Sequence, residues 1–371
     1  MAMLMMENSE PAMQLENQLF ALPATLTDRW RTEHEKLNPT TILTDNGSAG
    51  DINFFIPPST SGLLSLADMI LELEVGIKVR KSTGEWELIT TADGVGPVNN
   101  ILHSMFSSCH VTVANRLISD AATFYPYRAY LESLLSHSLD AQQSQLTSAG
   151  FYYDSPGSFN SETANNGEKI ERRYLILDTG ELLKKTVKYH IERVVMRVSD
   201  IPQRTQSTVV SNLQIGQIPK VVFIGFVDSE DFHGSQKKNP FNFQHFNITQ
   251  ISVEVDGQSY PTKPYTADFD RKLSLECYDG LLDTLGHRPS LQGGLPFNRT
   301  QYNDGYTIFG FDLTPGHTGR GPLTLIKQGN LSVSVSFGKP LKSTIMMVCM
   351  LIYDSIIEIN QHRQLIADFT T

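Results

Sequence analysis

The sequence has few cysteines and no long hydrophobic run. Its three cysteines, Cys109, Cys277 and Cys349, are far apart, and none belongs to a closely spaced pair of the kind that binds zinc. No window approaches the roughly 20 apolar residues of a membrane-spanning helix, and the opening MAMLMMENSEP lacks the features of a signal peptide. We therefore expect reduced thiols, no membrane span and synthesis in the cytosol.

Positive charge is also scarce. The 371 residues contain 30 Lys and Arg against 40 Asp and Glu, a formal net charge of −10. Non-specific binding to nucleic acid depends on clustered Lys and Arg, so this balance argues against a general phosphate-binding surface. The pair Lys237 and Lys238 is too short to form one. We expect no sequence-specific nucleic-acid partner.

Catalytic and cofactor-binding motifs are absent: the sequence has no nucleophile elbow, zinc-protease motif, phosphate loop or dinucleotide fingerprint. The best enzyme-like set is His190 and Glu192 with a later histidine, His233, His245 or His287, which could form the iron-binding face of a jelly-roll oxygenase. A strand, however, places residues i and i+2 on the same face whatever their role. An ordinary solvated strand edge explains the pair better.

A second cation-binding possibility is the acidic trio Asp228, Glu230 and Asp231. Carboxylates so close together also occur on ordinary surface loops, which is the simpler interpretation. We therefore predict no catalytic residue, no cofactor and no metal site, and a protein that is not an enzyme.

The last third of the chain is rich in predicted strands. Gly305–Thr314, Gly329–Pro340 and Ser343–Asn360 are apolar or alternating runs separated by turn residues. In the second run Leu331 and its alternate neighbours face one side and serines the other, which predicts a half-buried strand. The apolar stretch from Ile345 to Ile352 predicts a strand that is covered on both faces.

Further strands are predicted on both sides of a helical insertion. In the first half they are Ile52–Ser59, Leu63–Arg80 and Glu85–Thr90, and a short helix follows Pro97. In the second half, Lys220–Asp228 is a near-continuous apolar strand. Asn247–Pro261 is a hairpin that turns at Asp256–Gly257, and Lys263–Asn303 is a long connection with weak periodicity.

The insertion contains YPYRAYLESLL, residues 125–135, which has helical periodicity. Tyr127, Tyr130, Leu131 and Leu134 form one apolar stripe, and Arg128 and Glu132 are four residues apart on the opposite side. The strands of the two halves are compatible with two β-sandwich units in series, and we expect the stripe to pack on the first of them. We also expect Asp140 to cap a second helical stretch.

Several segments together resemble the hexon-like major capsid proteins of Polinton (Maverick) elements and adintoviruses, including their integrated copies in animal genomes. They are GPVNNILHSMFSSCHVTVANRLIS, YPYRAYLESLL with SQLTSAGFYYD, IGQIPKVVFIGFVD, KKNPFNFQHFNI with VDGQ, NDGYTIFGFDLTP, KQGNLSVSVSFGKPL and IEINQHR. They occur in the same order and span residues 51–363.

The resemblance implies an all-β fold of two tandem jelly-roll sandwiches with short helical insertions. It predicts an N-terminal arm at residues 1–48, a first jelly roll at 49–210 and a second at 211–371. Only Asp178 to Val187 separates two first-half strands where the family has more strands, so the first jelly roll is expected to be incomplete. The predicted strand at Ile345–Ile352, which is apolar on both faces, is expected at a subunit interface. The same is expected of the segment that contains Phe241, Phe243 and Phe246.

The implied function is that of a capsid building block: a homotrimer that tiles an icosahedral shell around double-stranded DNA. The implied partners are further copies of the chain and a penton-type minor capsid protein. The implied location is the capsid of the virion. Assembly is expected in the host cell, and the nucleus is one compartment in which it could occur. The alternatives are a single-jelly-roll penton or minor capsid protein and, less favoured, the metal-dependent oxygenase.

Overall fold

A computed structural model is the structure of this protein. It describes residues 37–41, 51–57, 69–73, 78–80, 84–88, 97–113, 116–117, 124–160, 173–177, 187–235, 238–286, 294–314, 328–359 and 365–367. The chain divides into two compact units, residues 1–64 and residues 65–371.

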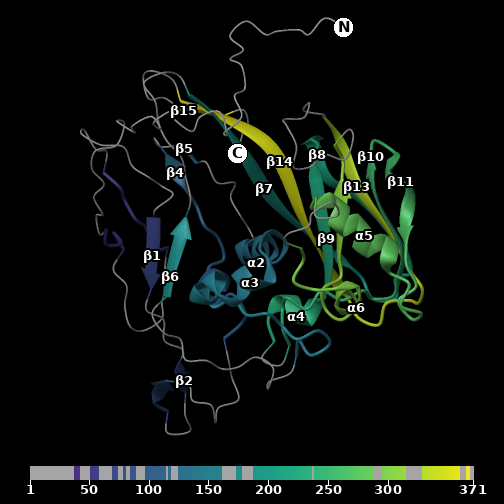
Figure 1. Ribbon diagram of the computed structural model, residues 1–371, viewed down its shortest axis with the longest axis horizontal. Coiled ribbons are helices and arrows are strands. Elements are labelled where there is room, and N and C mark those ends of the chain that lie inside the picture. Colours follow the sequence, from purple (N-terminus) through teal and green to yellow (C-terminus); the bar gives the residue numbers. More distant parts are fainter. Residues whose placement is uncertain are drawn as a thin grey trace, which may run out of the picture. The chain divides into compact units, whose positions relative to one another are not determined.

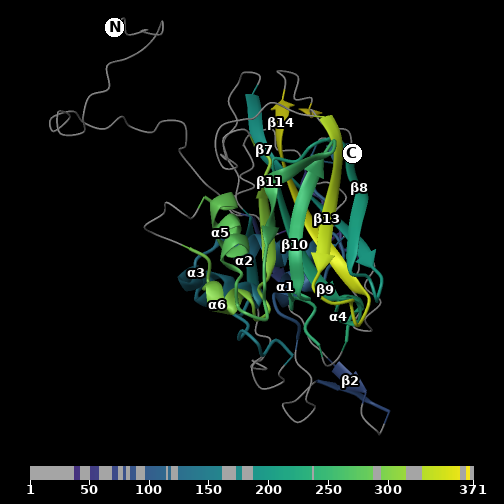
Figure 2. The ribbon, with the colours of Figure 1, turned by 90° about the vertical axis from the view of Figure 1, so that its right-hand side faces the viewer.

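The C-terminal unit contains a sandwich of two antiparallel sheets (Figures 1 and 2). One sheet has the order β7-β14-β9-β12, with the short strand β15 beside the far end of β14, and the other has the order β11-β10-β13-β8. The strands are β7 (Val187–Ile201), β8 (Ser207–Gln217), β9 (Val221–Asp228), β10 (Ile248–Val255), β11 (Gln258–Thr266), β12 (Ile308–Asp312), β13 (Gln328–Phe337), β14 (Ile345–Ile359) and β15 (Leu365–Ala367).

The connectivity of β7 to β14 is that of a jelly roll. The chain crosses from one sheet to the other at every step except the hairpin β10-β11, and its eighth strand, β14, lies between the first and the third. This order confirms the predicted all-β class. The sandwich begins at β7, upstream of the predicted start at residue 211, because β7 pairs with β14 at every position of its length and β8 pairs with β13. The predicted division of the whole chain into residues 1–48, 49–210 and 211–371 stays a prediction.

The predicted alternation and burial of the strands are confirmed. Along β13, Leu331, Val333, Val335 and Phe337 are buried, while the serines between them are half-buried on the outer face. In β14, residues 347–351 are buried on both faces, as the sequence predicts. The hairpin β10-β11 turns at Asp256–Gly257, where both residues have positive φ angles, as this turn type requires.

Three small sheets precede the sandwich in the same unit. They pair β1 (Met69–Leu73) with β6 (Arg173–Leu177), β2 (Lys78–Arg80) with β3 (Trp86–Leu88) and β4 (Thr112–Val113) with β5 (Arg116–Leu117). Other segments of the predicted first jelly roll, among them residues 58–68, 161–172 and 178–186, lie outside the described residues, so its incompleteness stays a prediction.

In the N-terminal unit, the described residues 51–57 form no strand, contrary to the prediction for Ile52–Ser59. The segment contacts residues 40–41 instead, with the Thr40 amide donating to the Asn53 carbonyl at 2.7 Å. The prolines that follow cannot donate to a strand ladder, which favours an irregular conformation.

Seven short helical segments are described. They are α1 (Ile101–Ser104), α2 (Tyr125–Ser136), α3 (Leu139–Gln143), η3 (Gln145–Ala149), α4 (Ser229–His233), α5 (Leu275–Thr284) and α6 (Arg299–Tyr302). The prediction that Asp140 caps α3 is wrong: the cap is Ser138, whose hydroxyl accepts from the Ala141 amide. Asp140 lies in the first turn instead. Among the described residues, no helix has the length and apolar character needed to cross a membrane.

Candidate functional site

Helix α2 packs on the C-terminal sandwich through a cluster of aromatic rings. Tyr130 stacks on Phe241 with ring centroids 4.2 Å apart, and Tyr127 meets Phe241 edge-on and stacks on Phe232. The Tyr127 hydroxyl donates to the Pro240 carbonyl at 3.0 Å. These contacts attach the helical insertion to the sandwich at residues 232–243.

The apolar stripe predicted for α2 is confirmed, and part of it packs on a surface outside the predicted first jelly roll. Tyr127, Tyr130, Leu131 and Leu134 are buried, and Arg128 pairs with Glu132 at 3.0 Å. Tyr127 and Tyr130 pack on residues 232–243 of the C-terminal sandwich, and packing of the stripe on the first jelly roll stays a prediction, because several segments of residues 49–210 lie outside the described residues. The physical reason for the observed packing is the row of aromatic side chains after α4, which provides a matching apolar surface.

The same packing corrects the expectation that the aromatic segment forms a subunit interface. Phe241 and Phe243 are fully buried within the chain, and Phe246 is packed against the core. Gly225 in β9 makes this possible, because a side chain there would overlap the Phe243 ring. The segment therefore has little apolar surface left for a second subunit.

A buried carboxylate lies beneath this aromatic cluster. Asp154, only 3% exposed, accepts hydrogen bonds from the side-chain amides of Asn99 at 2.8 Å and Asn239 at 3.3 Å. The Asn99 and Asn239 carbonyl oxygens accept from the Tyr152 and Phe241 backbone amides, which fixes the orientation of both amide groups. Burial raises the pKa of Asp154 to about 6, although the two amide hydrogen bonds oppose the shift.

A second polar cluster joins three neighbouring strands at one end of the sheet. The Lys220 ammonium lies 2.7 Å from Asp354 Oδ1 and 2.6 Å from Glu192 Oε1. Desolvation lowers the pKa of Lys220, but hydrogen bonds and charge interactions with both carboxylates outweigh it and leave the pKa raised. The sequence pattern missed this cluster, because its members come from positions far apart in the chain.

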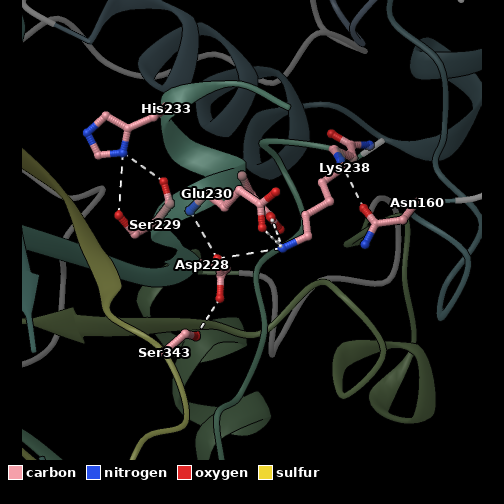
Figure 3. A network of polar contacts seen from close by, with 9 residues as sticks. Asn160, Asp228, Ser229, Glu230, His233, Lys238 and Ser343 are labelled. Atoms are coloured by element: carbon pink, nitrogen blue, oxygen red, sulfur yellow. Dashed lines mark hydrogen bonds and ion pairs between the residues drawn. The ribbon is translucent and has the colours of Figure 1, made fainter. Parts of the chain in front are cut away.

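A third cluster contains the acidic trio (Figure 3). Lys238 lies 2.6 Å from Glu230, 3.3 Å from Asp231 and 3.8 Å from Asp228. Asp228 also caps α4 by accepting from the Glu230 amide. The lysine of the same loop thus supplies the cation that these carboxylates require, which makes the trio a structural cluster.

The side chains of the oxygenase hypothesis that the structure describes do not converge. Glu192 pairs with Lys220, whereas the His233 ring contacts the Ser229 carbonyl oxygen at 2.7 Å and the His245 ring stacks on Phe269. His190 lies in β7 opposite Ile356, and His287 lies outside the described residues. Within the part of the chain that the structure describes, no group of three His, Cys, Asp or Glu side chains could hold a metal ion.

The three cysteines are free thiols, Cys109 exposed and Cys277 and Cys349 buried, as expected. Burial raises the pKa of Cys277 and Cys349, so the thiolate form that reacts or binds metal is disfavoured at both. The chemistry visible in the described residues is that of buried ion clusters and aromatic packing, which serves to hold surfaces together.

No protein-family model matches this sequence. The chain is similar to the uncharacterized protein F54H12.2 of Caenorhabditis elegans, with 24% identity over 311 residues that cover 66% of this chain and 74% of that protein.

Three solved structures are also similar. A chain of the Sputnik virophage has 13% identity and a TM-score of 0.34, covering 53% of this chain and 42% of its own. A chain of the PBCV-1 virus capsid has 10% identity and a TM-score of 0.32, and the match covers 54% of this chain and 56% of that chain. The mavirus major capsid protein has 12% identity and a TM-score of 0.27, and the match covers 54% of this chain and 46% of that protein. This chain thus matches about half the length of these solved chains.

Proposed function

We propose that this protein is a structural component of a virus-type capsid, a hexon-like building block that forms trimers and tiles an icosahedral shell around double-stranded DNA. The observation that carries the proposal is the jelly-roll order of β7 to β14, together with the colinear resemblance of the sequence to Polinton and adintovirus capsid proteins. The similar chains from PBCV-1 and mavirus are capsid components by their titles, the class to which this proposal assigns the chain.

The polar clusters support a structural role over an enzymatic one. In the described residues, Lys220 and Lys238 each neutralise the carboxylates around them, and Asp154 is enclosed by amides. Catalytic groups would instead be placed toward a cavity that could admit a substrate. Metal analysis of purified wild-type protein and of His190→Ala should find no stoichiometric iron or zinc in either, whereas metal lost on substitution would favour the oxygenase.

One observation favours the single-jelly-roll alternative: the described residues contain one complete eight-stranded sandwich. The paired strands β1 and β6 upstream favour the double jelly roll, because they belong to a further sheet. The two alternatives predict different particles, since a hexon-like trimer has a six-sided outline and a penton component forms five-fold rings.

The test is electron microscopy of the purified, concentrated full chain, combined with sedimentation at micromolar concentration. We expect trimers with a six-sided outline that associate into sheets or shells. Five-fold rings would favour the penton alternative. A stable monomer that never assembles would contradict the proposal.

A further inference from the structure

The ion cluster at Lys220 differs from an ordinary surface ion pair, because one of its two pairs is buried and a second carboxylate lies at its edge. Lys220 and Asp354 side chains are 6% and 9% exposed, whereas Glu192 is 53% exposed. Glu192 and Asp354 are directly opposite each other in the pairing of β7 with β14, so the two carboxylates are neighbours on one face of the sheet. Like charges in that position repel, and the Lys220 ammonium between them offsets the repulsion.

The backbone of Lys220 is hydrogen-bonded to a neighbouring segment on each side. The Lys220 amide donates to the Ile352 carbonyl at 2.8 Å, and the Lys220 carbonyl accepts from the Leu313 amide at 2.8 Å. Lys220 therefore has a fixed position beside β14, two residues from Asp354. An amine and a carboxyl group fixed in contact react as if at very high concentration, which can drive a condensation that is unfavourable between free molecules in water.

We propose that Lys220 and Asp354 condense to an intramolecular amide bond, with Glu192 as the proton-transfer group. This inference is independent of the proposed capsid function. It concerns a covalent modification that the chain performs on itself after the sandwich has folded.

The reaction balances without any other reactant. Glu192 transfers a proton from the Lys220 ammonium to Asp354, and the freed amine attacks Cγ of the neutral carboxyl group. The Nζ–Cγ bond forms as a Cγ–Oδ bond breaks. The departing oxygen keeps the transferred proton, takes a second proton from the attacking nitrogen and leaves as water. Glu192 ends as it began, and its half-exposed position gives the water a route to solvent.

The product removes two buried charges, whose desolvation opposes folding. The resting state is the ion pair, so the reactive pair of neutral amine and neutral carboxyl group forms rarely and the reaction is slow. Once formed, the bond joins the start of β9 to β14 and closes a loop that contains all strands from β9 to the middle of β14.

The test is the intact mass of the purified full chain, measured over days at neutral pH and followed by peptide mapping. We expect a mass lower than that of the sequence by one water molecule, and a branched tryptic peptide that contains Lys220 and Asp354. Wild-type protein that keeps the full sequence mass throughout would overturn the proposal, whether or not any variant folds.

Three variants separate this reaction from other losses of water. Lys220→Arg keeps the positive charge but cannot form the amide, so its mass should equal the sequence mass, and Glu192→Gln should slow the reaction at least tenfold. Lys238→Arg is the matched control, because Lys238 also contacts carboxylates but lies in a more exposed loop, and it should react like wild type. A water loss that persists in Lys220→Arg would show cyclisation elsewhere, such as at an Asp-Gly pair, and would overturn the proposal.

Discussion

At the scale of single residues, Asp154 is a charge buried without a cation. Its pKa is about 6 in the folded protein and 3.8 for an unperturbed group, so the folded state binds a proton more tightly than the unfolded state. Such a group makes the folded protein less stable as the pH rises from about 4 to 6, and the loss is complete above the folded-state pKa. Two pKa units correspond to about 3 kcal/mol.

This shift predicts the behaviour of Asp154→Asn in denaturant unfolding at several pH values. The difference in unfolding free energy between variant and wild type should move in favour of the variant by about 2 to 3 kcal/mol between pH 4 and pH 7. Comparing the two proteins cancels the titration of all other groups. A difference that does not change with pH would show that Asp154 titrates normally.

The ion clusters show what a sequence can and cannot reveal at this scale. The acidic trio is visible because its members are adjacent, and its lysine follows a few residues later. Lys220, Glu192 and Asp354 give no local signal, because the partners of Lys220 are 28 and 134 residues away. Only the strand register brings them together.

At the scale of elements, α2 provides a direct comparison of packing with surface charge. Leu131 is fully buried, whereas the Arg128–Glu132 pair is partly exposed. Leu131→Ala should cost about 2 to 5 kcal/mol of unfolding free energy, and Glu132→Ala only about 0.3 to 0.5 kcal/mol. Thermal unfolding should therefore show a clear drop for the first and almost none for the second. Equal, small effects would mean that α2 does not hold the insertion on the sandwich.

The contact of Gly225 with Phe243 gives a second test at this scale. Gly225→Ala should destabilise the protein by about 1 to 3 kcal/mol, because the added methyl group overlaps the Phe243 ring. In the background of Phe243→Leu the same substitution should cost much less, since the smaller side chain can move aside. Unfolding free energies of the two single variants and the double variant measure this coupling. Additive effects would contradict the described packing.

The elements themselves were predictable to different degrees. The alternation of β13, the turn at Asp256–Gly257 and the stripe of α2 follow from local patterns. The helix α5 was missed inside a connection with weak periodicity, although Cys277, Leu281 and Leu285 recur at intervals of four residues and are buried. The partner of α2 could not be predicted, because an apolar stripe specifies the face that is buried but not the surface that covers it.

At the scale of the whole molecule, the strands differ in how well they are protected from pairing with another chain. β14 is hydrogen-bonded on both sides at residues 345–352, to β7 and β9. In the described residues β8 is an edge strand, paired only with β13, and it bulges near Asn212, which has a positive φ angle. A bulge on an edge strand hinders pairing with another chain.

Hydrogen exchange should reflect this difference. Amides of residues 346–351 and of β9 should exchange only through global unfolding and so be the slowest in the molecule, whereas those near Asn212 should exchange orders of magnitude faster through local opening. Exchange measured by mass spectrometry on the native protein checks this order. Equally slow exchange at Asn212 in a dilute sample would indicate that β8 pairs with a partner there.

The place of β14 in the sheet also determines when the protein can fold. The strand between β7 and β9 is made after both of them, so for a time during synthesis both neighbours are present without the strand that joins them. Until then, the facing edges of β7 and β9 have no partner in their sheet and can pair with other nascent chains. The cell must therefore keep most of the chain from aggregating during synthesis. A truncated chain that ends before Ile345 lacks β14 and should therefore be bound by chaperones and degraded, because it cannot form a smaller stable sandwich.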